Sequence, residues 1–286
     1  MIIGIIVDFI VTFIICLIMY KCLRAGQRPN KKTIFKAVGL GLLAIILSII
    51  LQLLFEWLIN QTFEILFGRV MDQMPVFKVI DFVIRKVLIF VIIEEVAKCL
   101  LFKFMWNNGN FILKTPLQTT LLFVLVGATF SFVEDVFYIV NGTKPYFRII
   151  TSVSGHIVYA LIYSLFFIKE VVRLRAMYKV NHFIKLLDNP SEYSNIYVFD
   201  QKYLLKGLLL CIFVHFAHNL ICQLPLNNIL SIILLITEVI CLNIFFIFKI
   251  KKMIKNDTTY DDLARSRIIT NYPNLVDDLN KLHEPK

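Results

Sequence analysis

The chain alternates between long apolar runs and shorter polar stretches that carry most of its lysines and arginines. An apolar helix of about 20 residues crosses the roughly 30 Å of hydrocarbon in a bilayer. Seven runs are suited to this: Ile2–Tyr20, Ala37–Ile59, Val87–Met105, Leu117–Val140, Ile149–Ile168, Tyr203–Cys222 and Ile229–Phe248. The short alternating strands of an outer-membrane barrel are missing from the sequence. The pattern therefore predicts an all-α, polytopic transmembrane helix bundle of about seven spans.

The distribution of basic residues predicts the orientation of these spans. If the N-terminus lies outside, the inner loops and span ends hold nineteen lysines and arginines, and the outer ones hold six. Because basic residues gather on the cytoplasmic side, this favours an N-out/C-in bundle. The same asymmetry accounts for the net charge of +10 without a nucleic-acid partner. The expected surroundings are the lipid bilayer.

The chain divides into a transmembrane domain over residues 1–255 and a polar cytoplasmic tail over residues 256–286. The first run has no basic segment before it and no small-residue cleavage site after it, which favours a first span over a removed signal peptide. Between the second and third runs, Asn60–Lys86 mixes apolar and charged residues and is expected to lie at the membrane interface. The tail either forms a short helix or is disordered.

Four of the predicted spans carry polar side chains in their interiors. An ionisable side chain in hydrocarbon costs about 2.5–3.5 kcal/mol on insertion scales. Three such groups within one turn are therefore expected to serve a function. The intramembrane polar residues are Glu94, Glu95 and Lys98 in the third span, Glu134 and Asp135 in the fourth, His156 in the fifth, and His215, His218 and Asn219 in the sixth.

These polar residues lie at one depth in the membrane. At a rise of 1.5 Å per residue, Glu94, Glu134, His156 and His215 all fall roughly 10 Å below the outer surface, six or seven residues from the outer ends of their spans. The sequence could equally have scattered them along the spans. Their common depth predicts a single polar site, of which 87–222 is the core segment.

Helical spacing suggests how the site works. Glu94 and Lys98 are four residues apart, as are His215 and Asn219, so each pair shares a helix face. A carboxylate in an apolar pocket beside a cation can act as a general base near neutral pH. Histidine and asparagine donors can stabilise the oxyanion that forms when water attacks a carbonyl. We therefore expect Glu94 to activate water, with Glu95 supporting it or exchanging roles with it.

A metal site is the alternative to this glutamate mechanism. Histidines with a carboxylate bind zinc, and water bound to zinc is nucleophilic near neutral pH. The ligands would be His156, His215 and Glu134. No HExxH motif is present, and a His-x-x-His pair alone is a weak metal signal. The sequence therefore favours a site without a cofactor, with zinc as the alternative.

Further polar, aromatic and cysteine residues are expected to be structural. They are Asp8 at the outer interface, His182 on the inner surface, His218 and Glu238 within the bundle, Tyr159 and Tyr163 in packing, and the six cysteines in or beside apolar runs. The cysteine spacing suggests neither a disulfide framework nor a zinc cage.

The four polar segments together resemble the PrsW branch of the CAAX-protease and bacteriocin-processing superfamily of intramembrane proteases. The first motif of the branch, EExxK, is matched by Glu94-Glu95-Val-Ala-Lys98, and the second, FxxxE, by Phe130-Ser-Phe-Val-Glu134. A histidine in the next helix is matched by His156. The HxxxN motif of the wider superfamily is matched by His215-Phe-Ala-His-Asn219. Order and spacing agree over about Val87 to Cys222.

The chain departs from the prenyl proteases of that superfamily, which have EExxxR and FxxxH. Cys99 stands at the arginine position, Glu134 stands at the histidine position, and Asp135 replaces an asparagine found in many relatives. These differences point to the PrsW branch and away from prenylated peptides. The resemblance implies cleavage of a single-span membrane protein similar to an anti-sigma factor, or of a membrane-associated peptide. It also implies a bacterial plasma (inner) membrane.

Together these observations predict an intramembrane endopeptidase that cleaves its substrates near the outer membrane boundary. The expected catalytic residues are Glu94, Glu95, His215, Asn219, His156 and Glu134, with Lys98 setting the local charge. A proton- or ion-coupled transporter is a rival, because buried carboxylates and histidines also build proton relays. Against it, the spans show no obvious internal repeat, which many transporters have. A non-catalytic membrane scaffold or immunity protein is the third possibility.

Overall fold

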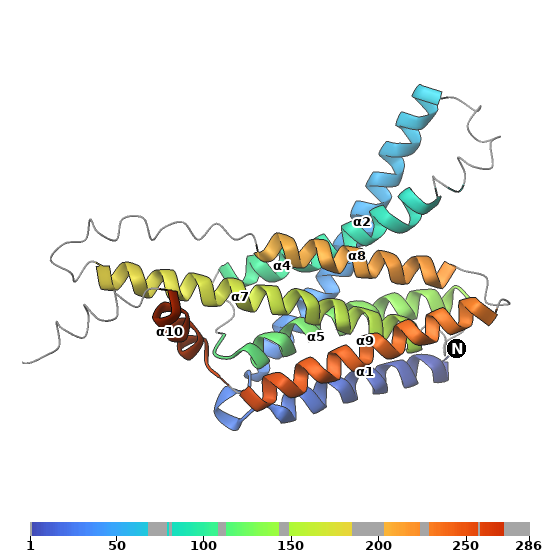
Figure 1. Cartoon of the computed structure of the whole chain (residues 1–286). Coiled ribbons are helices and arrows are strands. Elements are labelled where there is room, and N and C mark those ends of the chain that lie inside the picture. Colours follow the sequence, from blue (N-terminus) through green and yellow to red (C-terminus); the bar gives the residue numbers. More distant parts are fainter. Residues whose placement is uncertain are drawn as a thin grey trace, which may run out of the picture.

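The structure is a computed structural model, and it describes residues 2–67, 79, 82–107, 113–142, 149–184, 203–223, 229–256 and 258–271. Within these ranges the chain is helical throughout, apart from short turns, which confirms the all-α prediction. The elements are α1 (Ile2–Cys22), η1 (Ala25–Gln27), α2 (Lys31–Phe67), η3 (Phe82–Ile89), α4 (Phe90–Asn107), α5 (Pro116–Val140), η4 (Ile149–Val153), α7 (Ser154–Ile184), α8 (Tyr203–Gln223), α9 (Ile229–Asn256) and α10 (Tyr260–Asn271). Figure 1 shows most of the long helices side by side, with α2 running obliquely through the bundle.

Five of the described helices are long and apolar enough to cross a membrane: α1, α2, α5, α8 and α9. The predicted third and fifth spans form α4 and α7, which are not among these five. Since α4 carries Glu94, Glu95 and Lys98 and the second half of α7 is charged, their composition is less apolar. Both nevertheless pack inside the bundle, α4 against α2 and α8, and α7 against α5 and α8. The count of seven spans and their orientation stay predictions.

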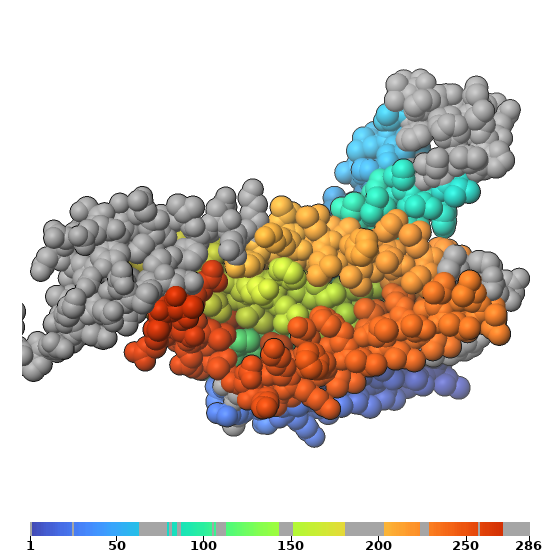
Figure 2. Space-filling model, viewed as in Figure 1, coloured from blue at the N-terminus to red at the C-terminus, as the bar shows by residue number. Residues whose placement is uncertain are grey.

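The surface of the outer helices suits a bilayer. Large aliphatic and aromatic side chains are exposed along α1, α2 and α9, among them Ile3, Phe13, Leu53, Ile236 and Phe248. An apolar surface of this extent is unfavourable in water and natural in lipid. Figure 2 shows α8 and α9 covering one face of the molecule, with a strip of α7 between them. The site helix α7 is thus largely enclosed.

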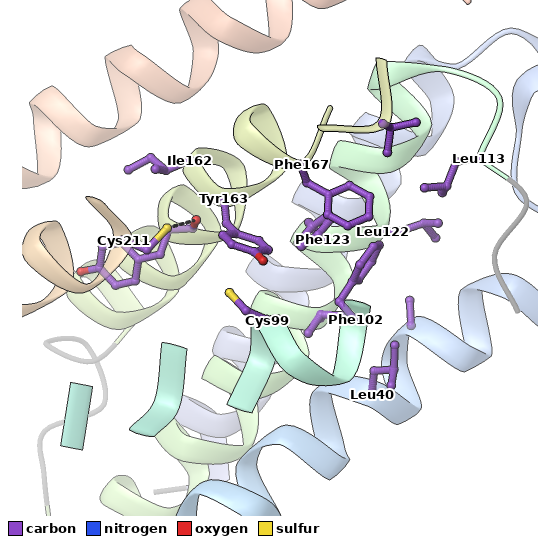
Figure 3. Packing of buried hydrophobic residues seen from close by; sticks show 14 of the residues in the cluster. Leu40, Cys99, Phe102, Leu113, Leu122, Phe123, Ile162, Tyr163, Phe167 and Cys211 are labelled. Carbon is purple, nitrogen blue, oxygen red and sulfur yellow. Dashed lines mark hydrogen bonds between the residues drawn. The ribbon is translucent and has the colours of Figure 1, made fainter. Parts of the chain in front are cut away.

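A cluster of aromatic rings holds α4, α5 and α7 together. Phe102 of α4 stacks on Phe123 of α5 with ring centroids 3.6 Å apart, and it meets Phe167 of α7 edge to face at 5.3 Å. Figure 3 shows these three rings with Tyr163 beside them. Because Phe102 lies one turn beyond Lys98 on α4, this packing positions the polar residues of α4 against α5 and α7.

A glycine lets α5 and α7 come close together. A Cβ atom on Gly127 would lie 2.8 Å from the backbone oxygen of His156 and 2.9 Å from the Cβ of Ala160. Small residues at such crossings let membrane helices approach backbone to backbone. The approach brings the α7 segment that carries His156 next to α5.

Two of the site helices begin with rare π-helical turns. The π-helix η3 leads directly into α4, and η4 leads directly into α7. Short π-helical segments are often found at functional sites, because the extra residue turns the following side chains to a new direction. The segment Asn60–Lys86, which was predicted to lie at the membrane interface, contains the end of α2 and the start of η3. Residues 68–78, 80 and 81 within it lie outside the described residues.

The C-terminal tail contains a helix, α10, that packs against the bundle. Of the two predicted alternatives, a short helix or disorder, the described part of the tail forms the helix. Tyr260 at the start of α10 is fully buried, and its hydroxyl lies 2.7 Å from the Thr119 hydroxyl of α5. The backbone N–H of Thr259 donates to the carboxylate of Asp262, and the Asp262 backbone N–H donates to the Thr259 hydroxyl. This reciprocal arrangement is a capping box, and the hydrogen bonds from Thr259 hold the pKa of Asp262 below its ordinary value.

Candidate active site

The four polar segments predicted from the sequence meet in one place. Glu94, Glu95 and Lys98 come from α4, Glu134 from α5, His156 from α7, and His215 and Asn219 from α8. Glu95, Lys98, His156 and His215 are each at most 8% exposed. The expectation of a single intramembrane cluster agrees with this arrangement.

A continuous chain of polar contacts links these side chains. Oε1 of Glu95 accepts a hydrogen bond from Lys98 Nζ at 2.5 Å and lies 2.8 Å from His215 Nδ1. Lys98 Nζ also lies 3.2 Å from His156 Nδ1, and His156 Nε2 lies 2.8 Å from Glu134 Oε2. The chain therefore runs from α8 through α4 and α7 to α5.

The partners define which nitrogen of each histidine carries a proton. A carboxylate only accepts, so His215 Nδ1 must donate its proton to Glu95, which leaves Nε2 with a lone pair. An ammonium only donates, so His156 Nδ1 accepts from Lys98 and Nε2 donates to Glu134. The unprotonated His215 Nε2 faces Glu94, whose Oε2 is 3.9 Å away.

The lysine pairs differently from the prediction. We expected Lys98 to neutralise Glu94, its neighbour four residues before. Instead, Lys98 contacts Glu95, three residues before, and Glu94 accepts a hydrogen bond from the Gln52 side chain of α2 at 3.2 Å. Both spacings place residues on one helix face, and the position of His156 on α7 selects the Glu95 side. The two glutamates therefore have separate environments.

A small cavity opens beside the histidines. Its volume is about 20 Å³, and it is lined by Glu134, Ser152, His156, Tyr159, His215, His218 and Asn219. A cavity must offer roughly 10–15 Å³ and several polar partners to hold one water molecule. The space therefore suits a single water among hydrogen-bonding groups. Glu134 belongs to its lining, and Glu94 does not.

Tyr159 is a site residue that the sequence reasoning assigned to packing. Its ring stacks on His215 with centroids 4.5 Å apart, and the residue is 1% exposed. Its hydroxyl is buried and has no hydrogen-bond partner among the residues that the structure describes. A Cβ atom on Gly155 would lie 2.7 Å from that hydroxyl, so the glycine makes room for it. The spacing of three from His156, which puts both on one face of α7, could have revealed it.

Other predicted residues take structural positions. His218 lines the cavity on one side and contacts Glu238 of α9 through Nδ1 at 3.0 Å, which ties α8 to α9. Asp8 is fully buried within the bundle, and its place at the outer interface stays a prediction. Asp135 is buried as well, and the Ser131 hydroxyl donates to its carboxylate. The side chain of His182 lies outside the described residues.

Three histidines, one glutamate and an asparagine line a water-sized cavity, and Glu94 and Glu95 lie beside these histidines. Such a polar site inside a bundle of apolar helices is typical of a membrane-embedded hydrolase. Comparison with family models matches residues 29–248 to the PrsW family of intramembrane metalloproteases. The chain belongs to this family, and the protein is an intramembrane protease. No curated protein and no solved structure matches the chain.

Proposed function

We propose that the protein is an intramembrane endopeptidase that cleaves a membrane-bound protein or peptide near the outer boundary of a bacterial inner membrane. The substrate class is a single-span membrane protein, as in an anti-sigma factor, or a membrane-associated peptide. The bundle crosses the membrane seven times with its N-terminus outside. The observation that carries the proposal is the water-sized cavity lined by Glu134, His156, His215 and Asn219 within the bundle.

The donor set fits a metal ion. One ligand atom each from Glu94, His156 and His215 lies within 4.8 Å of the other two. Two imidazoles and one carboxylate are a common protein ligand set for catalytic zinc. When bound, zinc would polarise the scissile carbonyl and lower the pKa of water. The sequence alone favoured a site without metal and offered Glu134 as the carboxylate ligand. The geometry instead supports zinc held by Glu94, His156 and His215.

The surrounding residues position His215 for this role. His156 would give up its contact with Lys98 or with Glu134 to bind the metal, because both of its ring nitrogens have a hydrogen-bond partner in this structure. Glu95 accepts the proton of His215 Nδ1, which directs the Nε2 lone pair toward Glu94. Carboxylates that bond the distal nitrogen of a histidine in this way fix its tautomer and raise its basicity as a ligand. Lys98 balances the charge of Glu95 at a distance of 2.5 Å. Glu95 and Lys98 are therefore positioning residues in this proposal.

We assign proton transfer to the carboxylate that lines the cavity. Glu134 lines the cavity and reaches His156 Nε2 at 2.8 Å. A general base must lie within hydrogen-bond reach of the proton that it takes. We therefore assign water activation to Glu134, although the sequence suggested Glu94. As the proton moves to Glu134, the water oxygen forms a bond to the scissile carbonyl carbon.

Two uncharged residues that line the cavity carry hydrogen-bond donors. Asn219 and Tyr159 both line the cavity, and the Tyr159 hydroxyl is buried without a hydrogen-bond partner among the described residues. Donors that are already aimed at a developing oxyanion give large rate effects, because they need no reorganisation during the reaction. We assign Asn219 and Tyr159 to this stabilisation. A buried, unpaired hydroxyl costs stability in the free protein, which is consistent with a functional reason for its presence.

The first experiment identifies the activity itself. Quantitative mapping of protein N-termini would compare cells that carry the wild type, Glu94→Gln or Glu170→Gln at matched levels. Glu170 is a suitable control because it is a buried α7 carboxylate that pairs with Arg173, 14 residues and about 21 Å along the helix from His156. A new N-terminus near the end of a single-span protein, present in wild type and control and lost in Glu94→Gln, supports a protease. Identical maps in all three cells would favour a transporter or scaffold.

The second experiment separates the proposed roles of the two glutamates. Purified Glu94→Gln should lose both bound zinc and cleavage, since it removes a ligand. Glu134→Gln should retain zinc and lose cleavage, since it removes the base. Wild-type activity that survives exhaustive chelation, with zinc absent by elemental analysis, would refute the metal site and restore the glutamate mechanism.

A further inference from the structure

A second cavity lies far along the helices from the candidate active site, where α5 begins and α9 ends. It is a partly open pocket with a volume of about 250 Å³, and its lining comes from α5, α7, α9, α10 and the residues just before α5 and α10. Figure 1 shows the C-terminal end of α9 close to α10 at this end of the bundle. Nothing in the proposed cleavage reaction uses this space.

The walls of the cavity are mostly apolar, and its polar groups come mainly from one helix. The apolar lining comes from Pro116, Leu117, Leu165, Ile168, Met253 and Leu263. Lys249, Lys252 and Asn256 of α9 supply the polar side, together with Thr115 and Thr258. An apolar pocket with two ammonium groups on one side matches an amphiphile that carries a negative charge at one end.

Two of the four lysines at the end of α9 line the cavity. Lys249, Lys252 and Asn256 are spaced at i, i+3 and i+7, so they share one face of the helix. Lys251 and Lys255 belong to the same helix end but do not line the cavity. A general preference for basic residues at one membrane surface does not choose a helix face. The cavity face of α9 therefore combines two positive charges with the apolar side chains of the cavity wall.

The two cavity lysines have no acidic partner among the described residues, and Lys249 lies over the Phe245 ring at 5.5 Å from its centroid. Among the ion pairs within the described ranges, none involves Lys249 or Lys252. The nearby acidic groups of α10 are already engaged: Asp261 lies 3.3 Å from Lys179, and Asp262 caps its own helix. Basic pockets between membrane helices bind the phosphorylated headgroups of anionic lipids.

We propose that this cavity binds one anionic phospholipid, with its phosphate between Lys249 and Lys252 and its first acyl carbons against Leu117, Leu165 and Ile168. Inorganic phosphate could supply the same negative charge as the lipid headgroup. The apolar wall of the cavity favours the lipid, because only the lipid has acyl chains to place against it. Because Leu263 of α10 closes one side, the bound lipid also holds the docked C-terminal helix against the bundle.

The test uses the full-length protein in a neutral detergent, titrated with phosphatidylglycerol and followed by native mass spectrometry. Wild type should retain one lipid per chain. Lys249→Gln/Lys252→Gln should bind about 30-fold more weakly, the size expected for two lysines at an anionic headgroup. The charge-matched control Lys251→Gln/Lys255→Gln should bind as wild type does. Equal weakening in both double variants would overturn the proposal, because general charge would then explain binding.

Two further arms identify the source of the phosphate. Phosphatidylcholine should not compete, and millimolar inorganic phosphate should not displace the lipid. Displacement by phosphate would overturn the lipid assignment in favour of a free anion. Leu165→Phe, which reduces the apolar part of the cavity without changing charge, should also weaken lipid retention. Unchanged retention in that variant would place the lipid elsewhere.

Discussion

Replacing Tyr159 by phenylalanine should lower catalysis while leaving the fold intact. The substitution keeps the ring that stacks on His215 at 4.5 Å and removes only the hydroxyl. That hydroxyl has no partner among the described side chains and backbone. Because an unsatisfied buried polar group costs about 1–3 kcal/mol, its removal should raise the free energy of unfolding slightly or leave it unchanged.

Catalysis, in contrast to stability, should become worse in Tyr159→Phe. Loss of one oxyanion donor costs about 2.7–4 kcal/mol of transition-state stabilisation, or about 100- to 1,000-fold in kcat. KM should stay the same, because the donor acts on charge that forms only in the transition state. The assay is cleavage, in proteoliposomes, of the substrate found by N-terminal mapping, with thermal unfolding measured on the same preparations.

The matched control is Tyr163→Phe, one turn further along α7. Tyr163 is also buried, but it does not line the cavity. This control should lose about 1 kcal/mol of stability and keep its kcat. If Tyr159→Phe retains kcat within about threefold, or if KM changes in place of kcat, the oxyanion role of Tyr159 is refuted.

Three other substitutions test the packing around the site. Glu95→Gln should destabilise the protein by about 3–5 kcal/mol, because Lys98 would remain buried without its partner. Adding Lys98→Met should restore stability, as measured by thermal unfolding. No recovery in the double variant would contradict the pairing of Lys98 with Glu95. Thr119→Val should loosen α10 by about 1 kcal/mol through loss of its hydrogen bond to Tyr260, measured as faster proteolysis of the tail with cleavage activity unchanged. Gly127→Val should push α5 and α7 apart and lower both stability, by about 1–3 kcal/mol, and kcat; an unchanged kcat would show that this helix contact does not position the site.

The sequence predicted which residues form the site because their cost in hydrocarbon is visible without a structure. Polar groups in apolar runs stand out at Glu94, Glu134, His156 and His215, and helical rise alone puts them at one depth. The sequence predicted less well which of these side chains contact one another. Whether Lys98 contacts Glu94 or Glu95 depends on where α7 places His156, and a one-dimensional pattern leaves that open.

The same limit applies to Tyr159 and to the tail. An aromatic residue among many in an apolar span is usually packing, and only the position of the cavity distinguishes the Tyr159 hydroxyl from that of Tyr163. The tail has a weak apolar pattern, so its composition allowed either a helix or disorder. Burial of Tyr260 against α5 decides between them.

The sequence by itself determined the membrane bundle, the membership of its polar site and the resemblance to the PrsW family, since hydrophobicity, helical period and motif order are local properties of the chain. The tertiary structure alone decided the partners of each charge, the cavity that faces Glu134 and not Glu94, and the basic pocket at the far end of α9. These features depend on how helices distant in sequence rotate and pack against one another, and close packing allows few such arrangements.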